Sequence, residues 1–185
     1  MAAVGLLALA MAYSCKNDIE TIHALTREVS YPDVTGVNVE MQYTDSGYLK
    51  GKIIAPEVFQ YNNVEEPYYD FTKGMTAIFY DRHGNETSYI KAKYAIYYTK
   101  KELWEGRQGV YGENKVTGEK IETELIFWDQ NEKRIYSEKF TKITRQDGIH
   151  IGEYGFDAVE DLSTIQLRGY SGRVTIKEED TGGEN

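Results

Sequence analysis

The chain has 185 residues, and its 21 basic and 30 acidic side chains give a formal net charge of −9. This charge argues against a nucleic-acid partner, because the phosphate backbone attracts basic proteins. The length suits a single domain with one core. The composition of 16 tyrosines, 17 glycines and only three prolines favours an all-β fold, because aromatic side chains suit half-buried strands and glycine supplies turn conformations.

The N-terminal segment is typical of an exported protein. Residues 2–13 form an apolar run without charge, which is shorter than the ~20 residues of a membrane-spanning helix and has the length of a signal-peptide core. The run ends in Ala12-Tyr13-Ser14-Cys15, an ending that resembles the lipobox of bacterial lipoproteins. We therefore expect a signal peptide over residues 1–15 and a lipidated Cys15 that anchors the chain to a membrane. The alternative is that Cys15 is a buried free thiol or an unused cysteine of the signal peptide.

The pattern of the sequence changes at Gly36. Residues 16–35 are mostly polar and contain only a short amphipathic stretch, which predicts a tether. From Val37 to Tyr43 apolar and polar residues alternate, as a strand with one buried face requires. We expect the folded domain to span residues 36–177 and the acidic, glycine-rich residues 178–185 to be disordered.

Turn signals recur along this domain and separate runs that are typical of strands. Antiparallel neighbours joined by short turns form a meander, and about ten strands in a small domain must curl or pack as two facing sheets to bury their apolar side. The sequence therefore predicts an all-β jellyroll or curled two-sheet sandwich, with residues 57–70 as a long connection or an edge element. The other expected runs are residues 52–55, 76–80, 87–98, 109–111, 121–128, 134–143, 150–156 and 164–176.

The alternation within these runs also predicts which side chains point inward. Residues two apart on a strand share a face, so apolar residues at that spacing are candidates for the interior. A single β-bulge would move every later residue of its strand to the other face. The inward candidates are Val39 with Met41, then Ile90, Ala92 and Ile96, then Leu125 with Phe127.

Candidate catalytic residues do not form a recognisable constellation. His23, His83 and His150 lie far apart in the sequence, and the spacings of zinc hydrolases, redox dithiols and phosphate-binding loops are absent. Glu122 and Glu124 share a strand face, which suits either a carboxylate pair or a solvated outer face, and we favour the second. We therefore expect no enzymatic activity, no metal and no cofactor.

Aromatic residues offer a second kind of candidate site. Trp104, Trp128, Tyr97 and Tyr98 are able to stack on a sugar ring, although such side chains more often cover the surface of a sheet. We favour the packing role for these four residues.

A scattered pattern of residues extends over nearly all of residues 36–176. Its members are Lys73-Gly74-Met75, Phe79-Tyr80-Asp81, Gly84-Asn85, Ala92, Tyr94, Tyr97, Trp104-Glu105, Val110, Gly118, Glu122-Thr123-Glu124-Leu125 and Trp128-Asp129, with Met41 to Tyr43, Asp45, Gly47 and Ala55 before them and Gly152, Gly155, Asp161-Leu162 and Gly169 to Val174 after them. This pattern resembles the LptC family of lipopolysaccharide-export proteins, in the lipoprotein form found in Bacteroidota.

The resemblance implies a twisted antiparallel β-jellyroll, open along one seam, that carries lipopolysaccharide across the periplasm. Such a protein receives its lipid from an inner-membrane ABC transporter of the LptB, LptF and LptG type and passes it to an LptA-like periplasmic jellyroll. The inward residues named above would then line an apolar trough for the acyl chains. Better-known relatives are anchored by a spanning helix, whereas this chain is expected in the periplasm, attached to the inner membrane as a lipoprotein through Cys15.

An open-ended jellyroll exposes edge strands that can pair with the next protein. The expected partner edge contains Val174 and Ile176. The alternative function is a structural or carbohydrate-binding envelope lipoprotein, in which the same sandwich has a solid core. The state of the interior distinguishes the two functions.

Overall fold

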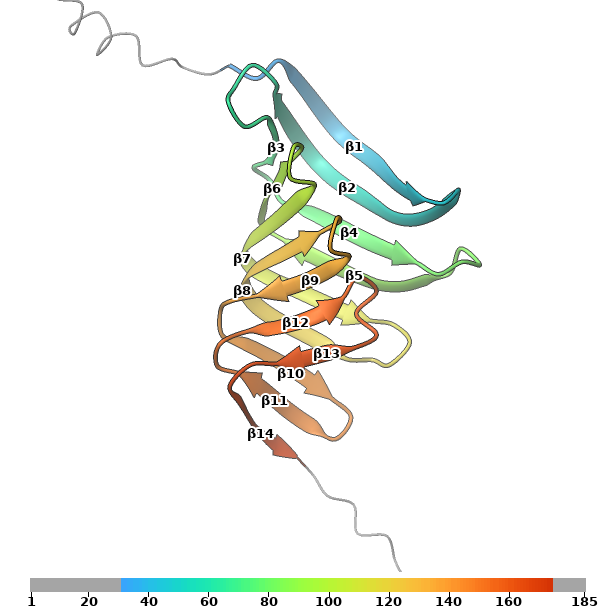
Figure 1. The fold of residues 1–185 in the computed structure, drawn as a ribbon, viewed down its shortest axis with the longest axis vertical. Coiled ribbons are helices and arrows are strands. Elements are labelled where there is room, and N and C mark those ends of the chain that lie inside the picture. Colours follow the sequence, from blue (N-terminus) through green and yellow to red (C-terminus); the bar gives the residue numbers. More distant parts are fainter. Residues whose placement is uncertain (1–30, 175–185) are drawn as a thin grey trace, which may run out of the picture. The chain divides into compact units, whose positions relative to one another are not determined.

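The computed structural model describes residues 31–174, and they form one antiparallel sheet of 14 strands (Figure 1). The predicted all-β fold is confirmed. Figure 1 shows the strands stacked one above another, from β1 and β2 at one end of this domain to β14 at the other. The strands are β1 (Val34–Asp45), β2 (Tyr48–Tyr61), β3 (Tyr68–Phe71), β4 (Met75–Tyr80), β5 (Glu86–Ala92), β6 (Tyr94–Tyr98), β7 (Leu103–Asn114), β8 (Lys120–Asp129), β9 (Arg134–Ser137), β10 (Thr141–Arg145), β11 (Gly148–Gly152), β12 (Phe156–Val159), β13 (Ile165–Leu167) and β14 (Tyr170–Val174).

The sheet is folded into two facing layers. The first layer contains β4, β5, β10, β11 and β14, and the second contains β3, β6, β9, β12 and β13. Longer strands pass through both layers. In β7, for example, residues 103–107 pair with β6 of the second layer and residues 111–114 pair with β5 of the first. The arrangement matches a curled, jellyroll-like sandwich.

The chain passes from one layer to the other at a corner, where left-handed backbone positions recur. Gln108 and Gly109 take φ angles of 66° and 77° in β7, at a break in the register between β7 and β8. Gly155, between β11 and β12, has a φ of 94°. A β-carbon at Gly155 would collide with the carbonyl oxygen of Ser137. Only glycine fits both this conformation and this space.

The core lies between the layers, because one face of each strand is buried there. Across the first layer, Ile53, Ala77 and Ile90 stand opposite one another on β2, β4 and β5, and all three are buried. Burying a large aliphatic or aromatic side chain contributes about 1.5–3 kcal/mol, so the inner face supplies much of the stability. The largest fully buried apolar side chains are Phe71, Phe156, Ile121, Ile135, Ile143 and Leu162.

The side opposite the corner is a seam. Within residues 31–174, every connection that reaches this side is a turn inside one layer, so no backbone segment crosses from layer to layer there. The first layer contributes the turns at residues 81–85 and 115–119, and the second contributes those at residues 130–133 and 160–164. We call residues 160–164, the loop between β12 and β13, the strap.

Candidate functional site

A row of aromatic rings covers the inner face of the second layer. Tyr69, Tyr97, Trp104 and Trp128 stand opposite one another on β3, β6, β7 and β8. Successive ring centroids lie 6.2, 4.5 and 6.1 Å apart. The Tyr97–Trp104 and Trp104–Trp128 pairs are stacked and the Tyr69–Tyr97 pair is tilted, and rings at these separations attract one another and present one wide apolar surface. The two tryptophans are therefore core residues, and neither is displayed to solvent as a sugar platform.

The first part of the predicted interior lies on the inner face. Ile90 and Ala92 on β5 are buried in the core, and Val39 and Met41 on β1 are half-buried and pack against it. Val39 and Met41 stand opposite Ala55 and Ile53 of β2, so they continue the inner face to that end of the sheet. Contact of these four residues with a lipid stays a prediction.

Leu125 and Phe127 do not point into the core, and this expectation was wrong. Both side chains are half-buried, whereas the next residues, Ile126 and Trp128, are buried in the core. The cause is the break between β7 and β8, where Glu124 alone stands opposite two residues of β7 and the alternation of β8 restarts after it. Phe127 stacks instead on Tyr136 of β9, with ring centroids 5.0 Å apart.

The predicted alternation also assigned Ile96 to the wrong face of its strand. The expected run over residues 87–98 is divided at the corner into β5 and β6, so its alternation restarts after Ala92. On β6 it is Ala95 and Tyr97 that face the core, while Ile96 is half-buried beside Asp70 and Glu105. Residues 57–70, expected as a long connection or an edge, instead supply the end of β2 and most of β3.

The two layers meet across the interior at Trp128. Its ring centroid lies 5.0 Å from that of Phe79 on β4 and 5.6 Å from that of Tyr43 on β1. Both contacts have edge-to-face geometry, which is favourable for aromatic pairs. Bulky side chains therefore fill the space just inside the seam.

The strap closes the seam from the second layer. Its Leu162 is fully buried, with a left-handed φ of 58°. Two side chains from strand segments of the first layer donate hydrogen bonds to the backbone of the strap. Asn114 Nδ2 donates a hydrogen bond to the Leu162 carbonyl at 3.2 Å, and Ser88 Oγ donates to the Asp161 carbonyl at 3.4 Å.

The carboxyl group of Glu160, in the strap, is partly buried, and this burial disfavours its charged form. Its Oε1 accepts a hydrogen bond of 2.8 Å from the indole N–H of Trp128. Burial raises the pKa of Glu160, and the hydrogen bond from Trp128 opposes that rise. A second polar contact joins a second-layer turn to the end of β1, where Lys133 Nζ lies 2.9 Å from Asp45 Oδ2. That hydrogen bond lowers the pKa of Asp45.

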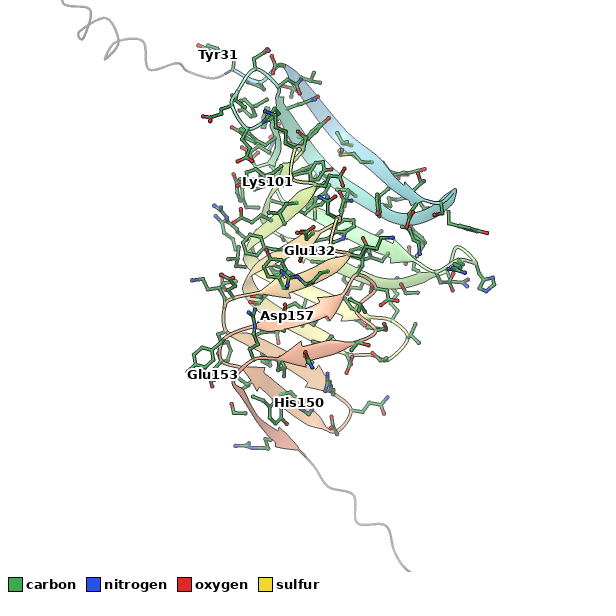
Figure 2. All side chains as sticks on the ribbon, viewed as in Figure 1. Tyr31, Lys101, Glu132, His150, Glu153 and Asp157 are labelled. Carbon is green, nitrogen blue, oxygen red and sulfur yellow. The ribbon has the colours of Figure 1, made fainter. Side chains whose placement is uncertain are left out.

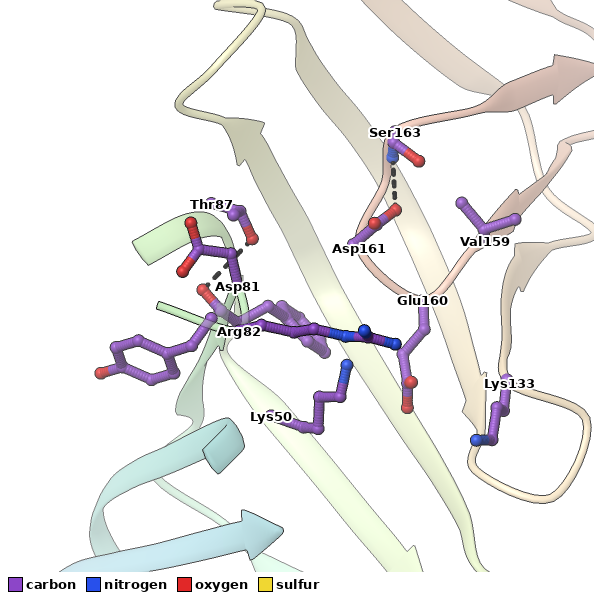
Figure 3. Close-up of a pocket in the computed structure, with 11 residues that line it drawn as sticks. Lys50, Asp81, Arg82, Thr87, Lys133, Val159, Glu160, Asp161 and Ser163 are labelled. Carbon is purple, nitrogen blue, oxygen red and sulfur yellow. Dashed lines mark hydrogen bonds between the residues drawn. The ribbon is translucent and has the colours of Figure 1, made fainter. Parts of the chain in front are cut away.

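A hollow of about 580 Å³ opens at the seam beside the strap (Figure 3). The β4–β5 turn forms one wall, and the strap forms another. Cationic side chains reach it from three different elements. Its charged lining residues are Lys50, Arg82, Lys133, Asp81, Glu160 and Asp161.

The remaining sequence candidates do not converge. His83 is exposed in a turn, whereas His150 is buried on β11, toward the β14 end of the domain (Figure 2). The His150 ring nitrogens lie 3.0 Å from the Tyr170 hydroxyl and 2.9 Å from Asp147 Oδ1, which makes the site a local polar cluster. Glu122 and Glu124 are exposed. Among residues 31–174, no group of three or more acidic, histidine or cysteine side chains is placed to hold a metal.

Several expectations concern the ends of the chain. Cys15, His23 and Ile176 lie outside the described residues. Val174 lies on β14, which among the described strands pairs only with β11 and is therefore an edge strand of residues 31–174. In the described part of the chain there is no helix capable of spanning a membrane.

Sequence patterns did not indicate the strap, the Trp128 contact or the charged hollow. A faint signal existed in Leu162, an apolar residue within the polar loop Glu160-Asp161-Leu162-Ser163-Thr164. Its burial depends on strands that precede it by about 50 to 70 residues, and no local pattern reports them.

A family model described as lipopolysaccharide-assembly, LptC-related matches residues 1–169. The match includes β1 to β13 and the strap. A comparison with curated proteins found no match.

Proposed function

The chain belongs to the family of LptC-related lipopolysaccharide-assembly proteins, and we propose that it carries lipopolysaccharide across the periplasm with the acyl chains held between its two layers. The family acts in lipopolysaccharide transport and is periplasmic and linked to the inner membrane. Family membership is the observation that carries the proposal. The apolar inner face gives it a physical basis, because each acyl chain of a dozen carbons costs ~10 kcal/mol when it is exposed to water.

The seam is the route of entry. Because no backbone segment of residues 31–174 crosses it, an acyl chain can pass between the layers without breaking the sheet. The side chains that close it are Trp128, Phe79, Tyr43 and Leu162. An empty apolar trough is unfavourable in water, so contact between the layers is the state expected without lipid. Lipid binding then replaces these contacts with acyl chains.

One polar group on the inner face favours a lipid over a purely hydrocarbon ligand. The indole N–H of Trp104 is buried and has no hydrogen-bond acceptor among residues 31–174. An unpaired buried donor costs about 1–3 kcal/mol. The carbonyl oxygen of an ester- or amide-linked acyl chain would remove this cost if it lay against Trp104.

The proposed partners follow from the ends of the sheet. An ABC transporter of the LptB, LptF and LptG type would deliver the lipid, and an LptA-like jellyroll would receive it through the edge that contains Val174 and Ile176. Transfer between apolar troughs of similar lining is nearly neutral in free energy, so ATP hydrolysis by the transporter would set the direction. We propose Cys15 as the lipidated anchor at the inner membrane, ahead of a tether over residues 16–35.

The alternative is an envelope lipoprotein with a structural or carbohydrate-binding role. The aromatic contacts across the interior favour this interpretation, since they are typical of a solid core. A tyrosine pair on the second layer, Tyr61 and Tyr68, stacks with ring centroids 4.7 Å apart and offers a platform for a sugar.

Photo-crosslinking in cells separates the two functions. A crosslinking amino acid is placed at Met41 or Ile126 of the inner face, and at the adjacent outward residues Gln42 or Leu125 as matched controls. Transport predicts capture of lipopolysaccharide from Met41 and Ile126 and much weaker capture from the controls. Met41 is only half-buried, so its variant keeps the test valid if the Ile126 variant fails to fold. Equal labelling from both faces, or none from Met41 in folded protein, would contradict the proposal.

A further inference from the structure

We propose that the hollow beside the strap is a subsite for an anionic phosphate group of the lipid headgroup, held by Lys50 and Arg82. This inference rests on the proposed transport function and locates the charged end of the cargo. Lys50 comes from β2 and Arg82 from the β4–β5 turn, and both line the hollow (Figure 3). The protein as a whole has a net charge of −9, whereas the charged lining of the hollow is balanced, with three cations and three carboxylates.

Neither cation has a carboxylate partner. Within residues 31–174, Lys50 and Arg82 form no ion pair at 4.0 Å or less. Lys133, the third cation of the hollow, is already paired with Asp45. The charges of Lys50 and Arg82 are therefore available to an external anion.

The carboxylates of the hollow already have donors of their own. Asp81 accepts hydrogen bonds from the backbone N–H groups of His83 and Asn85 in its turn. Asp161 accepts one from the Ser163 N–H within the strap, and Glu160 accepts the indole N–H of Trp128. These bonds hold Asp81 and Asp161 within their own loops and Glu160 against Trp128 of β8, and a phosphate can approach the cations from the open side.

The position of the hollow suits an amphiphile. The strap lies between the hollow and the apolar interior, because Glu160 and Asp161 line the hollow while Leu162 is buried in the core. Acyl chains that enter under the strap would leave the attached headgroup at the seam. Arg and Lys bind phosphate oxygens by charge-assisted hydrogen bonds, so the two ends of the lipid would be recognised at adjacent places.

The test compares two lipids that share their acyl chains. Bisphosphorylated lipid A, the same lipid A after enzymatic dephosphorylation, and inorganic phosphate alone are each titrated against the full chain and against the double variant Lys50→Gln with Arg82→Gln. The matched control is Lys120→Gln with Lys139→Gln, which removes the same charge from exposed positions outside the hollow. Melting curves confirm that each variant is folded.

We expect wild type and the control to bind phosphorylated lipid A about tenfold more tightly than the dephosphorylated form, since each exposed ion pair adds modestly to affinity. The Lys50 and Arg82 double variant should bind both lipids equally, at the wild-type affinity for the dephosphorylated one. Equal binding of both lipids by wild type would overturn this subsite and leave transport standing. Binding of inorganic phosphate alone, without a preference between the lipids, would overturn it as well. Failure to bind either lipid would overturn transport and the subsite together.

Discussion

Trp128 of β8 and Glu160 of the strap are joined by a hydrogen bond of 2.8 Å, and the same indole ring touches Phe79 and Tyr43 of the opposite layer. One side chain therefore fixes the strap and fills the space beneath it. Opening of the seam must break the aromatic contacts of Trp128, release its hydrogen bond, or do both.

The strap itself should make a large contribution to stability. Leu162→Ala removes a fully buried side chain, and we expect it to lower the free energy of unfolding by about 2–5 kcal/mol. It should also speed the uptake of lipid A, because the strap then holds the seam less firmly. Urea denaturation and stopped-flow binding measure the two effects. Leu125→Ala is the control, with an expected loss of roughly 1 kcal/mol from a half-exposed side chain. A similar loss in both variants would show that the strap is not packed as described.

Glu160 should make the stability depend on pH. Because burial raises its pKa, the folded protein keeps this proton to a higher pH than the unfolded chain does. Between the unfolded value of about 4.3 and the raised folded value, Glu160 therefore lowers stability as pH rises. Glu160→Gln cannot titrate, so its unfolding free energy should increase relative to wild type as the pH goes from about 4 to about 7. Urea denaturation at several pH values measures the difference.

The pH experiment has a control of opposite sign. The hydrogen bond from Tyr89 lowers the pKa of Glu113, so this group adds stability that is lost as pH falls from about 4.3 through the folded value. Glu113→Gln should accordingly lose stability relative to wild type as the pH rises through that lower window. The same sign for Glu160→Gln and Glu113→Gln would contradict the environment described for Glu160.

The register of β8 can be checked with one pair of neighbouring residues. Ile126→Asp places a carboxylate in the core and should lower stability by more than about 4 kcal/mol, or prevent folding. Leu125→Asp points outward and should cost about 1 kcal/mol, with normal lipid export. Thermal melting of both variants is sufficient. A larger loss of stability in Leu125→Asp than in Ile126→Asp would show that the register expected from simple alternation is the correct one.

Gly155 at the corner should tolerate no side chain. Gly155→Ala combines a left-handed conformation with a collision against the Ser137 carbonyl, and we expect a loss of at least about 3 kcal/mol. Gly118 also has a positive φ, of 76°, but apart from its two chain neighbours a β-carbon there would meet nothing within 4 Å among the described residues. Gly118→Ala should therefore show only the conformational cost, about 1–2 kcal/mol. Equal losses in chemical denaturation would show that the corner has room to adjust.

Much of the fold could be predicted from local pattern. The expected runs 134–143, 150–156 and 164–176 each correspond to two strands, one in each layer, with the corner between them. Period-two alternation identifies such a run because it depends only on neighbouring residues. The division into layers depends on where the backbone turns, and within these three runs Gly155 and Gly169 are the positive-φ residues that mark the turn.

The site was less predictable for the same reason. Alternation placed Ile90 correctly on the buried face because β5 pairs regularly with β4 from Ser88 to Ala92, whereas the break at Glu124 transposed Leu125 and Phe127. A bulge changes the face of later residues without changing their composition, so hydrophobicity alone does not reveal it. Contacts such as Asn114 with Leu162 join residues 48 positions apart and require the fold itself.

The corner that joins the layers confines any opening to a few backbone angles. Hydrogen bonds between neighbouring strands run within each layer, so the two layers can separate about the corner while these hydrogen bonds stay intact. Amide hydrogen exchange would hardly register such a motion. Indole fluorescence would report it at once, because Trp128 would lose its contacts with the facing wall while the protein remained fully folded.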